Sequence, residues 1–181
     1  MTEPIYQLET LQSEFNPTVG GIQIHFTSYL CTLGANVLDG GVRSFVTEQS
    51  STLGSIALTN RANSGSITVT GSAKIVAEGS AGVGATVNKV GRTTGWTQGK
   101  VSNTCVNTGV SGTNIVQLCQ TWVTAKKAIV GGGDSGSAVW SGTPASATLV
   151  GLLWGGSTNG RTFIFSPWDQ VEDELGPLTT F

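Results

Sequence analysis

One glycine-rich segment has residue types and a spacing that could serve nucleophilic chemistry. Residues 131–137 read Gly-Gly-Gly-Asp-Ser-Gly-Ser. A nucleophilic serine needs a tight turn that exposes its hydroxyl, and the glycines around Ser135 permit such a backbone. The N–H of Gly133 could lie beside that of Ser135 and form an oxyanion hole, while Asp134 could anchor the turn by pairing with a buried cation or amide. By spacing alone, such a run is more often a surface loop.

The sequence offers few partners for this serine. His25 is the single histidine of the chain, and it falls on the polar face of an alternating segment, residues 22–26. The simplest interpretation of that position is an ordinary histidine, exposed or hydrogen-bonded, without a catalytic role. Lys126 and Lys127 could suggest a serine–lysine dyad, but adjacent lysines in a loop are usually solvated.

Composition excludes several classes of protein. Of the 181 residues, 11% are charged, against about 25% in a typical soluble domain. A net charge of −2 gives no basic field for nucleic acid, and no apolar run is long enough to span a membrane. Three cysteines and one histidine exclude a Cys₄ or Cys₂His₂ zinc site, so we expect no metal and no cofactor. The amino end lacks the basic start and apolar core of a signal peptide, so either a leader was removed or the product is not exported.

Short alternating segments dominate the chain after a polar, acidic arm that we place at residues 1–19. They are bounded by Gly, Asn or Ser, as β-strands are, and they predict an all-β sandwich or barrel. The predicted strands are residues 22–26, 31–38, 42–47, 66–70, 74–78, 86–90, 100–106, 114–119, 137–140, 148–154 and 162–165. One helix is predicted near the carboxyl end, with Ser166 as N-cap, Pro167 as first helical residue and a stop after Leu175 at Gly176.

Two of the three cysteines flank a pair of these strands. A disulfide between Cys105 and Cys119 would close a short loop and stabilise the chain by about 3 kcal/mol in the chain-entropy model. Two unpaired buried thiols are the alternative.

Several segments together resemble the chymotrypsin-like (trypsin-fold) serine peptidases of the bacterial streptogrisin type. The serine segment, residues 133–137, is similar to the nucleophile signature of this family. Residues 90–101, which read Val-Gly-Arg-Thr-Thr-Gly-Trp-Thr-Gln-Gly-Lys-Val, resemble the opening of its second barrel. Residues 153–156, Leu-Trp-Gly-Gly, resemble the strand that lines its substrate cleft, and the predicted helix matches its terminal helix.

The resemblance assigns roles to particular residues. Ser135 would be the nucleophile, with the N–H groups of Gly133 and Ser135 as oxyanion hole. Trp154, Gly155 and Gly156 would pair with substrate backbone as an added strand. Ile129 stands where the family commonly has a residue that sets substrate specificity. Because this residue is not acidic, the resemblance does not support a trypsin-like preference for substrates with Lys or Arg.

The first half of the chain departs from the family pattern. Residues 45–52 read Phe-Val-Thr-Glu-Gln-Ser-Ser-Thr, so Ser50 and Ser51 stand where the resemblance implies the catalytic histidine and its neighbouring cysteine. No aspartate occurs between Asp39 and Asp134 to orient a base. Cys31 matches the family cysteine whose partner position is now Ser51, which predicts an unpaired thiol. A segment of the first barrel that carries the base and its orienting acid is therefore missing, and a Ser135–His25 pair would need a rearranged lobe.

We therefore predict a chymotrypsin-like double β-barrel with a truncated first barrel at residues 20–80, and a second barrel with the C-terminal helix at residues 81–181. The resemblance implies a secreted serine endopeptidase that acts on peptides or proteins, but without the histidine and aspartate we expect little or no turnover. The alternatives are a non-catalytic peptide-binding module and a plain structural β-domain. Loss of barrel strands leaves unpaired edges, which favours self-association through the truncated lobe.

Overall fold

The computed structural model describes residues 18–20, 23–26, 29–32, 36–39, 42–45 and 51–180, and they form fourteen strands and one helix. The strands are β1 (Thr18–Gly20), β2 (Gln23–Phe26), β3 (Tyr29–Thr32), β4 (Asn36–Asp39), β5 (Val42–Phe45), β6 (Ser51–Thr59), β7 (Val69–Glu78), β8 (Thr86–Gly91), β9 (Gly95–Gly109), β10 (Val116–Thr124), β11 (Ala138–Thr143), β12 (Ser146–Gly156), β13 (Thr162–Pro167) and β14 (Leu178–Thr179). The helix, α1, spans Trp168–Leu175. The prediction of a β-protein with one C-terminal helix is confirmed.

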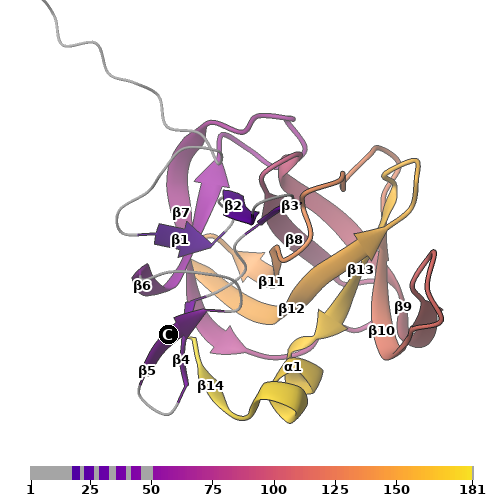
Figure 1. Ribbon diagram of the computed structural model, residues 1–181. Coiled ribbons are helices and arrows are strands. Elements are labelled where there is room, and N and C mark those ends of the chain that lie inside the picture. The colour runs from indigo at the N-terminus through magenta and orange to yellow at the C-terminus, as the bar shows by residue number, and fades with distance from the viewer. Residues whose placement is uncertain are drawn as a thin grey trace, which may run out of the picture.

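Six strands close into a barrel in the second half of the chain (Figure 1). The order is β12-β11-β8-β9-β10-β13, and β13 pairs back onto β12 to complete the ring. Alternating apolar side chains point into it, since strand periodicity sends every second residue to one face. Its core consists of Val87, Val101, Val123, Ile129, Val139, Val150, Leu153, Phe163 and Phe165. This ring is the rigid element that carries the serine segment.

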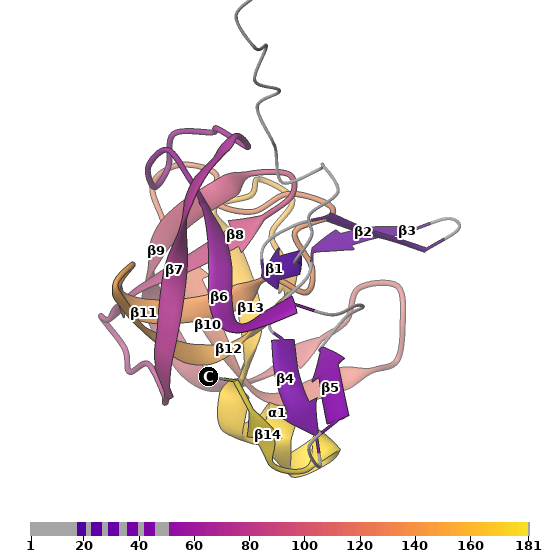
Figure 2. The same ribbon diagram turned by 90° about the vertical axis from the view of Figure 1, so that its left-hand side faces the viewer.

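The antiparallel hairpin of β6 and β7 is joined to the barrel by a parallel pairing of β7 with β12. A second apolar core fills the space between this hairpin and the barrel, and it contains Ile56, Leu58, Ile75, Trp140 and Trp168. The short strand β4 pairs with β14 on one side and with β5 on the other, as Figure 2 shows. Among the described residues that precede β8, no second closed ring forms.

Several predicted strand boundaries are wrong. The prediction missed β6, which contains Gly54 at φ 72° and in which five of the six residues from 54 to 59 are buried, so that it shows no clear alternation. The predicted strand at residues 31–38 is divided between β3 and β4, whereas those at 66–70 and 74–78 fall in or beside the single strand β7. Residues 1–17, most of the predicted arm, lie outside the described residues.

Helix α1 ends at Leu175 as predicted, but it begins later than expected. Pro167 is the N-cap and Trp168 the first helical residue, and no side chain caps the helix. Ser166 does not cap it because its hydroxyl donates instead to Gln120 Oε1 at 2.8 Å, across to β10. Within the part of the chain that the structure describes, no helix is long and apolar enough to cross a membrane.

Candidate functional site

The serine segment forms a tight turn between Ile129 and β11. Gly133 and Gly136 adopt φ values of 94° and 90°, which are left-handed conformations that favour glycine. The Asp134 carbonyl accepts hydrogen bonds from the Ser137 amide at 3.1 Å and the Ser137 hydroxyl at 2.5 Å. These contacts turn the backbone back on itself and leave the Ser135 side chain half-buried at the bend.

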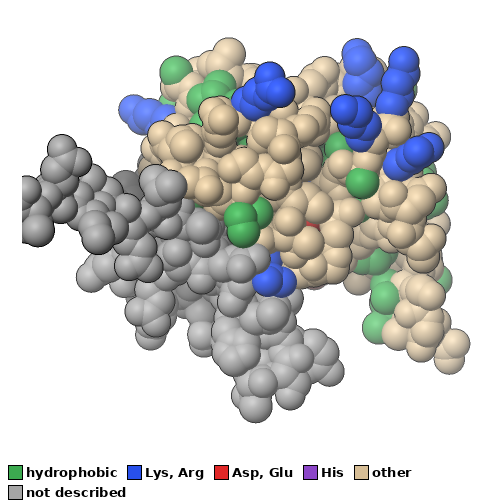
Figure 3. All heavy atoms as spheres, turned by 90° about the horizontal axis from the view of Figure 1, so that it is seen from above, with side chains coloured by type: hydrophobic (Ala, Val, Ile, Leu, Met, Phe, Trp, Pro, Cys, Tyr) green, Lys and Arg blue, Asp and Glu red, His purple; other side chains and the backbone are tan. Residues whose placement is uncertain are grey.

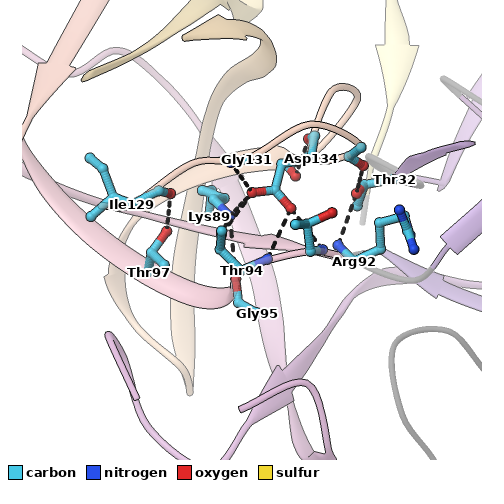
Figure 4. A network of polar contacts seen from close by, with 12 residues as sticks. Thr32, Lys89, Arg92, Thr94, Gly95, Thr97, Ile129, Gly131 and Asp134 are labelled. Atoms are coloured by element: carbon cyan, nitrogen blue, oxygen red, sulfur yellow. Dashed lines mark hydrogen bonds and ion pairs between the residues drawn. The ribbon is translucent and has the colours of Figure 1, made fainter. Parts of the chain in front are cut away.

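The Asp134 carboxylate connects this turn to residues 89–94 of the barrel through an ion pair and hydrogen bonds (Figure 4). Its Oδ2 lies 2.8 Å from Lys89 Nζ and also accepts the Thr94 hydroxyl at 2.7 Å and the Gly131 amide at 2.9 Å. Its Oδ1 accepts the amides of Thr93 at 2.9 Å and Thr94 at 3.2 Å. Five donors thus satisfy a carboxylate that has no solvent exposure, as a buried charge requires.

Lys89 is the buried cation that the aspartate needs. Its side chain is fully buried on β8, and its ammonium also contacts the Thr94 hydroxyl. Burial lowers the pKa of Lys89, and the attraction of Asp134 opposes this. Burial by itself would raise the pKa of Asp134, but the charge and hydrogen bond of Lys89, with the donors at Thr94 and Thr93, hold it below its ordinary value.

Thr32 of β3 connects the first part of the chain to the same turn. Its amide donates to the Ser135 carbonyl at 2.8 Å, and its hydroxyl donates to the Gly133 carbonyl at 2.8 Å. The hydroxyl in turn accepts the Arg92 amide at 3.0 Å. The sequence analysis missed this residue, because nothing in the local pattern around Thr32 indicates a contact across a hundred residues.

The amides of the turn differ in their hydrogen bonds. The amides of Asp134 and Gly136 donate to the carbonyls of Gly131 and Leu153, at 3.1 and 2.7 Å. Those of Gly132, Gly133 and Ser135 make no hydrogen bond to any other described residue. The Ser135 hydroxyl donates to the Trp154 carbonyl at 3.2 Å, an oxygen that cannot accept its proton permanently.

The strand segment at residues 154–156 runs beside the serine and has an open edge. Pairing of β12 with β11 stops at Leu152, whereas Gly155 and Gly156 pair with β13 on the other side. A Cβ added at Gly155 would meet no heavy atom within 4 Å, which shows open space in front of the strand. The Trp154 indole is fixed by its N–H, which donates to Gln120 Oε1 at 2.7 Å.

The remaining predicted residues lie in different surroundings. Ile129 is 1% exposed, so its side chain is part of the barrel core. Lys126 and Lys127 are exposed, and neither forms an ion pair with another described residue. His25 belongs to β2 and Cys31 to β3, and their side chains lie outside the described part, as do Ser50 and its neighbours at residues 46–49.

The predicted disulfide between Cys105 of β9 and Cys119 of β10 is confirmed. Cys119 lies at the register shift between the pairs Gln117–Thr108 and Gln120–Val106, and Cys105 lies at the next shift, between Gln120–Val106 and Trp122–Asn103. In the described part of the chain, no three His, Cys, Asp or Glu side chains gather in a way that could hold a metal ion.

Comparison with solved structures identifies the fold. A glutamic acid-specific serine protease, described as using a histidine triad in substrate binding, superposes with a TM-score of 0.71 at 22% identity, over 91% of this chain and 100% of that one. Thermobifida fusca protease A superposes with a TM-score of 0.69 at 20% identity, over 90% of this chain and 98% of that one. Nocardiopsis protease superposes with a TM-score of 0.68 at 19% identity, over 89% of this chain and 97% of that one. No protein-family model and no curated protein sequence matches the chain.

The chain therefore has the chymotrypsin-like fold of bacterial serine proteases, with a closed second barrel and a C-terminal helix. This confirms the fold class that the resemblance implied. At these identities the likeness establishes the fold, and the roles of individual residues depend on the site itself.

Proposed function

We propose that Ser135 is a nucleophile for acyl transfer and that the amides of Gly133 and Ser135 form its oxyanion hole. The observation that carries this proposal is the turn itself, in which these two amides make no hydrogen bond to another described residue while the buried Asp134 fixes the backbone between them. Amide donors held in place before the reaction stabilise negative charge on a carbonyl oxygen without any cost of reorganisation.

Among the described side chains, none is placed to act as a general base for Ser135. The Ser135 hydroxyl donates to a backbone carbonyl, and none of the described titratable side chains accepts its proton. Without a base the hydroxyl is a weak nucleophile, and removal of triad members in serine proteases lowers the rate by several orders of magnitude. We therefore propose little or no peptidase turnover, since an amide leaving group also needs protonation.

An activated ester is a less demanding substrate. Ser135 Oγ would form a bond to the acyl carbon as the bond to p-nitrophenolate breaks, and the hydroxyl proton would pass to water. Hydrolysis of the acyl-enzyme by water would then restore the serine. Because p-nitrophenolate leaves without protonation, this reaction needs less help from a base.

The test compares labelling with turnover. We expect a fluorophosphonate probe to label the wild type slowly, p-nitrophenyl acetate to be cleaved weakly, and casein to be cleaved hardly at all. Ser135→Ala should lose labelling and ester cleavage, whereas Ser137→Ala, a serine in the same turn, should keep detectable labelling. His25→Ala should change neither activity. Robust casein cleavage that His25→Ala abolishes would contradict the proposal and indicate a working Ser–His enzyme.

A non-catalytic peptide-binding module is the second candidate. The open edge at residues 154–156 favours it, because a peptide can add as a strand to such an edge through main-chain hydrogen bonds. Peptide or protein ligands fit both candidates. Labelling of Ser135 without cleavage of either p-nitrophenyl acetate or casein would favour this second function, and absence of labelling and cleavage would mean that the oxyanion hole is not formed.

We further propose that the protein works outside the cell, because its fold relatives are bacterial proteases and a disulfide persists best in an oxidising compartment. Self-association through the first lobe remains a prediction. Light scattering at micromolar concentration should give a mass above that of one 18.6 kDa chain, and a monomer mass would contradict it.

A further inference from the structure

A groove opens between β10 and α1, outside the serine turn. Its volume is about 590 Å³, and it lies at the end of the barrel where Figure 1 places α1. Val116 and Leu118 of β10 form one wall, Val171 and Leu175 of α1 form the other, and Trp154 lies in its floor. Two elements therefore form the groove: the disulfide-linked strand β10 and the C-terminal helix α1.

Apolar side chains gather at this groove with little cover. Val116 is 56% exposed, Leu118 64% and Leu175 57%. With their neighbour Ile115 they account for four of the six large apolar side chains that are exposed in the described part of the chain; the other two are Val76 and Val83. A concentration of exposed apolar side chains beside a concave surface is typical of a binding site.

The charges at the groove are of one sign. Among the described residues that line it, Asp173 and Glu174 are the charged ones, and Asp169 and Glu172 belong to the same short helix. Lysine and arginine side chains stand instead on the face seen from above in Figure 3, which shows almost no acidic side chain. An apolar groove with acidic residues along one wall is complementary to a ligand that combines apolar and cationic side chains.

The polar groups of the floor are already satisfied. Gln120 Oε1 accepts the Trp154 indole and the Ser166 hydroxyl, and Gln120 Nε2 donates to Gln170 Oε1 at 3.2 Å and to the Leu118 carbonyl at 2.7 Å. A ligand therefore need not supply hydrogen bonds to these side chains. Apolar contact and the acidic wall would determine its binding.

We propose that this groove binds a cationic amphipathic peptide segment of a partner protein, with apolar side chains between β10 and α1 and lysine or arginine against Asp173 and Glu174. The inference does not depend on Ser135 as a nucleophile. It places a protein-interaction surface next to Trp154, whose carbonyl contacts the Ser135 hydroxyl.

The experiment measures fluorescence anisotropy of a short fluorescein-labelled peptide of alternating leucine and lysine, added to the full chain. We expect saturable binding that Leu118→Ser weakens about tenfold, the loss expected for one buried leucine contact. Val83→Ser, which removes an equally exposed side chain elsewhere, should leave the affinity unchanged. Asp173→Lys with Glu174→Lys should weaken the lysine peptide about tenfold, because two attractions become repulsions.

Two matched peptides test the chemistry of the ligand. Replacement of every leucine by glutamine, or of every lysine by glutamate, should abolish binding to the wild type, and the charge-reversed variant should gain affinity for the glutamate peptide. The inference is overturned if the leucine–lysine peptide does not saturate, if the glutamine or glutamate peptide binds equally well, or if Leu118→Ser and Val83→Ser behave alike. Thermal unfolding of each variant verifies that it is folded, and Ser135→Ala should still bind, which separates this result from the outcome of the labelling test.

Discussion

The ammonium of Lys89 lies 2.8 Å from Oδ2 of Asp134, and neither side chain is exposed to solvent. One residue belongs to a barrel strand and the other directly precedes Ser135, so the ion pair ties the serine turn to the barrel. The geometry of the Gly133 and Ser135 amides depends on this pair, because Asp134 lies between them in the chain.

Lys89→Met should destabilise the protein by about 3–5 kcal/mol, since it leaves a buried carboxylate without its counter-charge. Lys89→Met with Asp134→Asn should be more stable than Lys89→Met alone, because it removes the uncompensated charge as well. Urea unfolding measures the free energy of unfolding of both variants. Fluorophosphonate labelling of Ser135 shows whether the turn keeps its geometry. A Lys89→Met protein of wild-type stability would show that the pair does not hold the turn.

Stability should fall in acid because of Asp134. Its folded pKa is lowered, so the pair contributes its full stability above the unfolded carboxylate pKa, roughly 4, and loses it as the pH falls through the lower folded value. The free energy of unfolding should therefore decrease more between pH 6 and pH 3 in the wild type than in the Lys89→Met, Asp134→Asn variant. Equal decreases in the two proteins would assign the acid sensitivity to other carboxylates.

Gly133→Ala should damage the site more than Gly132→Ala. A Cβ at Gly133 would lie 2.7 Å from Arg92 Nη1 and 3.0 Å from Thr93 Oγ1, and its φ of 94° disfavours alanine. At Gly132 a Cβ meets nothing within 4 Å. We expect Gly133→Ala to lower the free energy of unfolding by about 1–3 kcal/mol and to lose fluorophosphonate labelling of Ser135. Gly132→Ala should resemble the wild type in stability and in labelling. Wild-type labelling of Gly133→Ala would argue against a role for that amide.

The disulfide should contribute about 3 kcal/mol to the free energy of unfolding. The double variant Cys105→Ala, Cys119→Ala should lose this contribution, as measured by urea unfolding. Peptide mapping without reduction should find one linkage, between Cys105 and Cys119, and one thiol at Cys31 open to alkylation. A bond from Cys31 to either of the others within one chain would overturn both the resemblance of the first lobe and its proposed truncation.

Local chemistry explains what the sequence could predict. The turn around Ser135 is encoded within seven residues, because glycine conformational freedom and backbone amides act over that distance. Strand alternation is equally local and indicated most of the second barrel. The start of α1 could not be predicted in this way, since Ser166 has the residue type of an N-cap but donates to Gln120 on another strand.

By itself the sequence indicated an all-β chain, a serine turn and a candidate cysteine pair, because each of these depends on residues close together along the chain. Only the tertiary structure decided that Lys89 is the partner of Asp134, that Thr32 holds the carbonyls of Gly133 and Ser135, and that β10 and α1 enclose an apolar groove. A lysine in an alternating strand ordinarily faces water. Its burial opposite a carboxylate forty-five positions away depends on how the strands pair and close the barrel, which no local pattern encodes.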